Sequence, residues 1–210
     1  MHHPPSSMSI LAQALVDAIE TQPRPKPKPA AKSEPDKSLW IDNAGLILFS
    51  PFLQRYLQYA GLVEDKSWVS VEARHHGVRL LQMMVDPSGE WNEASLALPK
   101  LLCGLQPDSI VDPYIPLPED LRGQDAALIE VALSHWTAAG KIGIEGFRAA
   151  WLARNASLRI RDDHWLLRVE AMGADMLLEL LPWDIAYISL PWMSAVIYVD
   201  WGEKAKFNAI

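Results

Sequence analysis

The chain has 210 residues, half of them apolar, and a formal net charge of −7. This length and composition fit one domain with a real core and an appendage. No run of about 18 uncharged apolar residues is present, so we expect no membrane span, and the first residues lack the pattern of a signal peptide. The single cysteine, Cys103, excludes an intrachain disulfide and a zinc site built from several cysteines.

The charge is unevenly distributed along the chain. Residues 1–38 carry five basic and four acidic side chains, whereas residues 39–210 carry 14 basic and 22 acidic ones, a net of −8. Affinity for nucleic acid rests on neutralising phosphates with basic side chains. We therefore expect no nucleic-acid partner for the acidic part of the chain.

Residues 1–20 are predicted to form a tail with a short amphipathic helix at residues 8–20, because apolar residues such as Leu11, Leu15 and Ile19 recur there at helical spacing. Residues 21–38 form a Pro/Lys-rich linker, in which the alternating prolines exclude helix and central strand. Fully extended, this linker reaches about 55 Å. It is either a tether without specificity or the carrier of a docking helix.

Residues 39–210 are predicted to form one α+β domain. Ser50 suits an N-cap, Pro51 the first helical position and Gly61 the stop of a helix over residues 50–61. The apolar run at 44–49 is too short to assign to helix or strand. Further helices are expected at 70–85, at 93–103, from Pro118 to Gly140 and at 143–154, with a proline-rich loop at 107–119.

After Asn155 the apolar period changes from helical to alternating, which predicts strands. Residues 158–161 and 164–170 are expected to form a hairpin that turns at Asp162-Asp163. Residues 174–181 are expected to form one or two helical turns, followed by strands at 184–189 and 195–201. Helices followed by a small antiparallel sheet make an α+β fold.

No catalytic or ligand-binding motif is found, neither a Gly-x-Ser-x-Gly elbow nor a phosphate loop nor a dinucleotide fingerprint. His75 and His76 are adjacent, so on a helix they point about 100° apart and do not suit chelation of one metal. Cys103 is interpreted as a small buried hydrophobe rather than a nucleophile. We therefore predict no enzyme activity, no cofactor and no metal site.

The triplet Leu-Pro-Trp occurs at 181–183 and again at 190–192, around an alternating run. Pro182 and Pro191 are expected to bracket a strand, because proline is excluded from a central ladder. Trp183 and Trp192 are an odd number of positions apart, so a straight strand would point them to opposite faces. This favours one strand with a tryptophan anchor at each end over a duplicated binding repeat.

All nine tryptophans lie beyond residue 38. Large aromatic side chains either build a core or anchor a protein interface, and the sequence leaves both uses open. The candidate protein-interface residues are Trp183, Trp192 and Trp201, together with Leu11, Leu15 and Ile19 of the predicted N-terminal helix.

Several blocks of sequence occur in a recognisable order: 43-NAGLILFSPFL-53, 98-LPKLLCGL-105, 164-HWLLRVE-170 and 181-LPWDIAYISLPWM-193, followed by 197-IYVDW-201. Over roughly Leu39 to Trp201 the chain resembles the contractile injection system tape measure protein family. In such phage-tail-like machines a sheath contracts around a rigid tube and drives it through a target envelope. The resemblance implies a structural role without catalysis. It also implies tube, baseplate or spike proteins as partners, and cytoplasmic assembly followed by incorporation into the particle.

A tape measure sets tube length by its own extended length. The whole chain as one helix would span only about 315 Å, and a compact domain of the size expected here has a radius of gyration of roughly 15 Å. We therefore expect a module that acts at the tube end or baseplate in tube assembly or length control, without a long ruler. An adaptor or cargo-loading chaperone of the same system is the alternative. The sixfold tubes implied by the resemblance leave a homo-oligomer, as a ring or a trimer, open.

Overall fold

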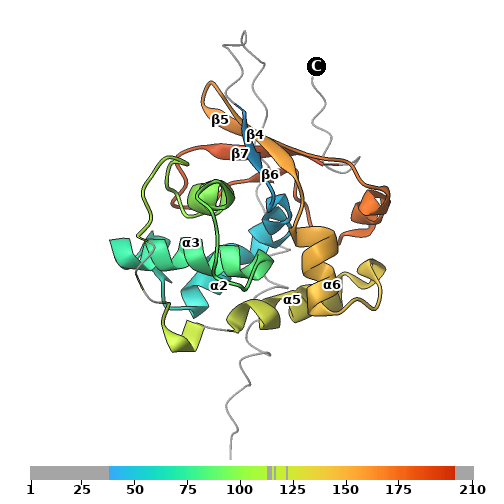
Figure 1. Ribbon diagram of the computed structural model, residues 1–210, viewed down its shortest axis with the longest axis horizontal. Coiled ribbons are helices and arrows are strands. Elements are labelled where there is room, and N and C mark those ends of the chain that lie inside the picture. The colour runs from blue at the N-terminus through green and yellow to red at the C-terminus, as the bar shows by residue number, and fades with distance from the viewer. Residues whose placement is uncertain (1–37, 113–114, 116, 122, 202–210) are drawn as a thin grey trace, which may run out of the picture.

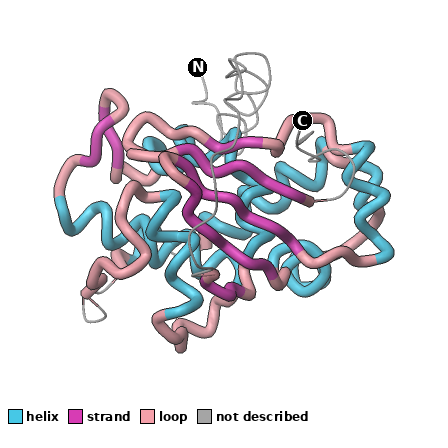
Figure 2. Tube along the Cα trace, turned by 90° about the horizontal axis from the view of Figure 1, so that it is seen from above, coloured by secondary structure: helices cyan, strands magenta, loops and turns pink. Residues whose placement is uncertain are grey.

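The computed structural model describes residues 38–112, 115, 117–121 and 123–201. A five-stranded sheet lies along the top of the domain in Figure 1, and the helices lie beneath it. Seen from above, the strands pass in front of the helices (Figure 2). Within the described residues, the helical layer therefore covers one face of the sheet and leaves the other face turned outward.

Short strands lie near both ends of the described residues, with a run of helical elements between them, and the bounds are as follows. The chain begins with β1 (Leu39–Ile41), the 3-10 helix η1 (Ala44–Phe49), α2 (Ser50–Tyr59), and the hairpin of β2 (Val63–Glu64) and β3 (Ser67–Trp68). The helical layer continues with α3 (Val71–Val85), η2 (Ala94–Leu96), α4 (Ala97–Leu102), η3 (Glu119–Leu121), α5 (Gln124–His135), η4 (Thr137–Ala139), α6 (Ile144–Phe147) and the π-helical turn η5 (Arg148–Leu152). The last elements are β4 (Ala156–Arg161), β5 (His164–Val169), the 3-10 helix η6 (Gly173–Leu180), β6 (Tyr187–Ile188) and β7 (Val196–Asp200).

The α+β class is confirmed, with two differences in the sheet. The strand order is β1-β4-β5-β7-β6, so the first strand precedes the helices instead of following them. In addition, β5 and β7 run parallel, with Trp165 opposite Ile197 and Leu167 opposite Val199, whereas the other pairs are antiparallel. A parallel pair needs a connection of about a dozen or more residues to return to the same end, and the stretch that contains η6 and β6 supplies it. The sheet is therefore mixed and not wholly antiparallel.

The helices predicted at 50–61 and 70–85 are present as α2 and α3, but Ser50 is not the N-cap of α2. This helix follows directly on η1, Phe49 holds its cap position, and no side chain caps it. The Ser70 hydroxyl accepts a hydrogen bond from Ala73 N–H at 3.0 Å, which caps the start of α3. The single helix predicted from Pro118 to Gly140 is wrong. It is interrupted at Gly123, whose φ of 79° lies in the left-handed region, and α5 ends before Trp136. No helix among the described residues combines the length and apolarity needed to cross a membrane.

The strand predicted at 184–189 is shorter than expected, because only Tyr187 and Ile188 pair, in β6. Before it, the Asp184 carboxylate accepts a hydrogen bond from Ala186 N–H at 2.8 Å, which turns the backbone. Ile185 and Ile188 are both buried, so the alternation of the sequence run is broken between them.

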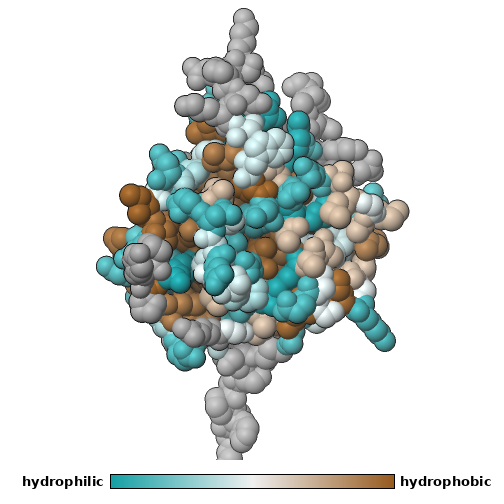
Figure 3. Space-filling view, viewed as in Figure 1, coloured by the Kyte–Doolittle hydropathy of each residue, from teal (hydrophilic) through white to brown (hydrophobic). Residues whose placement is uncertain are grey.

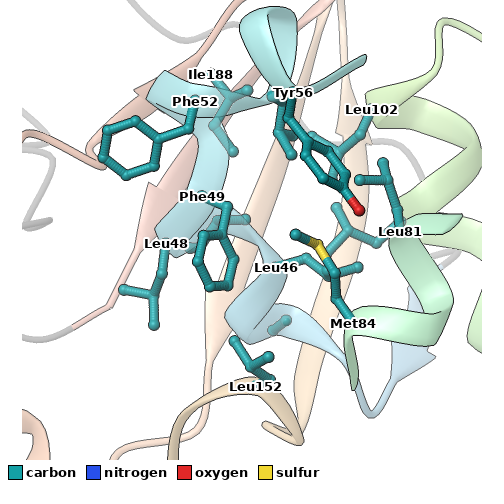
Figure 4. Close-up of a cluster of buried hydrophobic side chains, with 14 of the residues drawn as sticks. Leu46, Leu48, Phe49, Phe52, Tyr56, Leu81, Met84, Leu102, Leu152 and Ile188 are labelled. Atoms are coloured by element: carbon teal, nitrogen blue, oxygen red, sulfur yellow. The ribbon is translucent and has the colours of Figure 1, made fainter. Parts of the chain in front are cut away.

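The core lies between the sheet and the helices, around η1. All residues of η1 are buried. Figure 4 shows Leu46, Leu48 and Phe49 of this element meeting Phe52 and Tyr56 of α2. The same cluster includes Leu81 and Met84 of α3, and Ile188 reaches it from β6. The apolar run at 44–49, which has no clear period of its own, is thus the centre of the hydrophobic core.

Candidate interaction surfaces

Trp183, from the first Leu-Pro-Trp triplet, is an anchor within the core. Its side chain is buried, and its indole N–H donates a hydrogen bond to the Leu48 carbonyl at 2.9 Å. Its ring meets Phe52 edge to face, with centroids 4.8 Å apart. The side chain therefore fixes the segment before β6 to η1 and α2.

Trp192, from the second triplet, anchors the other end of the same stretch on different elements. Its indole N–H donates to the Leu102 carbonyl at 2.8 Å, and its ring lies 5.3 Å from that of Trp68. Gly104, with φ of +75°, lies so close that an added Cβ would be 2.4 Å from the Trp192 carbonyl oxygen. The two triplets thus bracket one segment with an anchor at each end, although the straight strand expected between them is reduced to Tyr187 and Ile188.

Trp201 is fully buried at the end of β7 and continues the inward-facing series of Ile197 and Val199. The Arg154 guanidinium carbon lies 5.0 Å from the centre of its ring, a cation–π contact. Arg154 also donates to both carboxylate oxygens of Asp175, at 2.8 and 3.1 Å. Trp201 therefore covers a buried ion pair at the inner side of the sheet.

The ionisation of Asp175 follows from these contacts. Burial opposes the charged form, but hydrogen bonds from Arg154 and from Met172 N–H hold the pKa of Asp175 below its usual value. The Arg154 guanidinium also donates a hydrogen bond to the Glu170 carbonyl at 2.7 Å, which fixes its orientation. The pair is therefore charged at neutral pH and joins η6 to the start of β4.

The predicted interface residues differ in how much of each side chain is exposed in a single chain. Trp183 and Trp201 are buried, and Trp192 is half-buried. Leu11, Leu15 and Ile19 lie outside the described residues. Contact of any of the six residues with a partner protein stays a prediction.

The side chains considered for chemistry lie apart from one another. Among the described residues, no group of three or more His, Cys, Asp or Glu side chains is placed to hold a metal ion. Cys103 is buried, and burial raises the pKa of its thiol, which opposes formation of the nucleophilic thiolate. Asp162 and Asp163 form the turn between β4 and β5, as predicted.

The face of the sheet turned away from the helices carries a different set of side chains. Residues directly paired across strands share one face of a sheet. Arg159 is opposite Leu166, Leu166 is opposite Tyr198, and Tyr198 is opposite Tyr187. We call this surface the outer face; it consists of Trp40, Ser157, Arg159, Arg161, His164, Leu166, Arg168, Tyr187, Val196, Tyr198 and Asp200.

The outer face is basic and aromatic, although the chain is acidic. Arg159, Arg161 and Arg168 are all the basic residues between positions 155 and 201, and all three lie on this face. Trp40, on the edge strand β1, is 68% exposed. Tryptophan, tyrosine and arginine are the residue types enriched at binding hot spots. The residue types of the outer face are therefore those of a protein interface.

Elsewhere, polar and apolar residues are interspersed over the side of the molecule in view in Figure 3. Exposed apolar side chains outside the outer face include Ile110 and, at or beside η6, Met172, Met176 and Leu180. Single exposed apolar residues are normal on soluble proteins. The outer face therefore differs from the rest of the surface in its residue types and strand register rather than in its exposed apolar area.

Sequence reasoning missed the outer face as a site. The alternation of Arg159 and Arg161 in β4 was a usable signal, because both must share one side of a strand. The contribution of Tyr198 and Tyr187 was not readable, since it depends on the parallel register of β7 against β5.

The comparisons with known proteins give one family. A family model described as "Contractile injection system tape measure protein" matches residues 7–201. The matched region includes the predicted N-terminal helix, the linker and the described domain. No curated protein and no solved structure matches the chain.

Proposed function

The chain belongs to the contractile injection system tape measure protein family, and on that premise we propose that it acts at the tube end or the baseplate, in tube assembly or length control. Membership gives the chain a structural role in the injection machine. The tube, baseplate or spike proteins of that machine are the proposed partners. Assembly in the cytoplasm, before the particle is complete, is part of the same proposal.

The observation that carries this position is the compactness of the described domain. Its longest α-helix, α3, has 15 residues, which correspond to about 22 Å. The strands and helices of residues 38–201 fold back on one another around one core. A domain of this shape does not supply an extended template, so it fits a terminal or initiating module better than a ruler.

Two elements are proposed to contact the particle. The outer face offers exposed Trp40, Arg161 and Arg168, and the predicted helix offers Leu11, Leu15 and Ile19 on a long linker. Of the tryptophans predicted at an interface, half-buried Trp192 retains surface for a partner. Trp183 and Trp201 are proposed to act on such an interface by holding the strands beneath it.

Electron microscopy of particles with and without this protein tests the role. We expect deletion to reduce particle number, to leave malformed particles or to change tube length, because an end module sets where assembly starts or stops. Complementation with the full chain should restore the wild-type distribution of tube lengths. Particles of normal number and length after deletion would overturn the proposal.

An adaptor or cargo-loading role is the second candidate, favoured by the Pro/Lys-rich linker that carries the predicted docking helix. Deletion of residues 1–38 separates the two roles. Normal particles that lack cargo would favour the adaptor. Malformed particles would favour the assembly role, since the same segment is then needed to build the tube.

A further inference from the structure

We propose that the outer face is the binding site for an acidic amphipathic helix, and that residues 8–20 of the same chain occupy it in the free protein. The consequence for the particle rests on the proposed function: a face covered in the free chain becomes available when a particle protein displaces the segment. The contact itself is a property of the isolated chain and is tested there.

The outer face has an apolar centre with basic flanks. Leu166 and Tyr198 lie side by side in the middle of the sheet and are half-buried by their neighbours. Arg159 adjoins Leu166 in register, and Arg161 lies two positions further along β4, exposed. A ligand that places apolar side chains over the centre and carboxylates near β4 matches this arrangement.

Residues 8–20 have the complementary chemistry. Their predicted stripe includes Leu11, Leu15 and Ile19, and their only charged residues are Asp17 and Glu20. A helix of about 13 residues is marginal in water unless its apolar side is covered. Packing on the outer face would cover that side and bring opposite charges together.

The connection makes the contact easy to form within one chain. The linker enters the domain at β1, which is the edge strand of the same sheet. The 18-residue linker contains five prolines and spans up to about 55 Å when extended, whereas five strands spaced about 4.8 Å apart extend about 19 Å. The linker is therefore long enough for residues 8–20 to reach the whole face, and the contact forms within one chain. The family match also begins at residue 7, so segment and sheet belong to one matched unit.

Disulfide trapping in the full-length chain tests the contact. Ala18→Cys lies in the predicted stripe, and Ser157→Cys lies on the outer face opposite Trp40. The matched control pairs Ala18→Cys with Ser88→Cys, an exposed position in the loop after α3. Native Cys103 is buried and does not compete. We expect intramolecular trapping at Ser157 to exceed the control about tenfold in dilute protein.

Exchanging the charges of two residues gives a second test of the same contact. Arg161→Glu changes an exposed residue at the end of β4 and should lower trapping at Ser157. Asp17→Arg in the same chain should then restore it, because the pair of opposite charges is re-formed. Circular dichroism of each variant verifies that the domain is folded.

Three outcomes would overturn the proposal. Equal trapping at Ser157 and Ser88 would mean that the segment has no preferred site. Disulfide-linked dimers that increase with concentration would assign the face to a second copy. Trapping that appears only when a particle protein is added would assign it to that partner. None of these results changes the outcome of particle deletion, so failure here is distinguishable from failure of the proposed function.

Discussion

The inner and outer faces of the five-stranded sheet use the same residue types in opposite surroundings. Leu167 on the inner face is fully buried, whereas its neighbour Leu166 points outward and is half-buried. An arginine–aspartate pair stands on each side. Arg154 meets Asp175 at 2.8 Å in the buried layer, and Arg168 meets Asp200 at 2.8 Å on the outer face.

The difference shows that residue type alone does not decide what a side chain contributes. The Arg154 and Asp175 side chains are 2% and 8% exposed, against 57% and 37% for Arg168 and Asp200. Removal from water makes an unpaired charge costly and an ion pair hard to replace singly. In solvent the same kind of pair is screened and contributes little to stability, so Arg168 and Asp200 are not needed to hold the fold together.

The largest expected difference between the faces is the loss of one arginine. Arg154→Met leaves Asp175 buried without its partner and should lower the free energy of unfolding by about 3–5 kcal/mol. Arg168→Met should lower it by at most about 1 kcal/mol. Urea unfolding of both variants, followed by circular dichroism, measures the two values. Similar losses would show that the two pairs do not differ in the way their burial indicates.

The adjacent leucines give a second matched comparison. Leu167→Ala should lower the free energy of unfolding by about 2–5 kcal/mol, because a cavity remains among inward-facing side chains. Leu166→Ala removes the same atoms from a half-solvated position and should cost clearly less. The two variants carry the same substitution at adjacent positions of β5. Thermal or urea unfolding therefore measures how burial alone changes the loss of stability. A larger loss at Leu166 would contradict the assignment of the faces.

The buried pair also predicts a pH dependence of stability. The pKa of Asp175 is lowered in the folded protein from its ordinary value of 3.8. Its contribution is therefore fully present above the unfolded pKa and is lost as pH falls through the folded pKa. Asp175→Asn should be less stable than wild type at neutral pH, and the gap should narrow below about pH 4. A gap that is constant from pH 7 to pH 3 would rule out this linkage.

The sequence was most informative where local signals act within one element. Ser70 caps the start of α3, Gly61 follows the end of α2, and the alternation after Asn155 marks the β4–β5 hairpin. The repeated Leu-Pro-Trp indicated one segment with a tryptophan anchor at each end, although the straight strand assumed between the two is absent. These features depend on neighbours a few residues apart, which a single sequence contains.

The predictions that were wrong or missing concern how segments distant in the sequence pair or pack. Gly123 could be tolerated in a helix, but the chain uses its left-handed conformation to end one element and begin α5. Nothing local indicates that β7 joins β5 in parallel, since alternation gives the faces of a strand and not its neighbour. The outer face could therefore be recognised only after the register had placed Tyr198 beside Leu166.

The smallest expected effect on stability belongs to Trp40, and it separates recognition from folding. Trp40, which β1 places on the outer face, is 68% exposed. Trp40→Ala should change the free energy of unfolding by no more than about 0.5 kcal/mol, yet it should lower trapping of Ala18→Cys at Ser157→Cys, because Trp40 lies opposite Ser157. Fully buried Trp201 gives the opposite case, where Trp201→Ala should cost about 3–5 kcal/mol. If Trp40→Ala destabilised the fold as strongly, its ring would be part of the core layer, and the outer face would lose its exposed aromatic anchor.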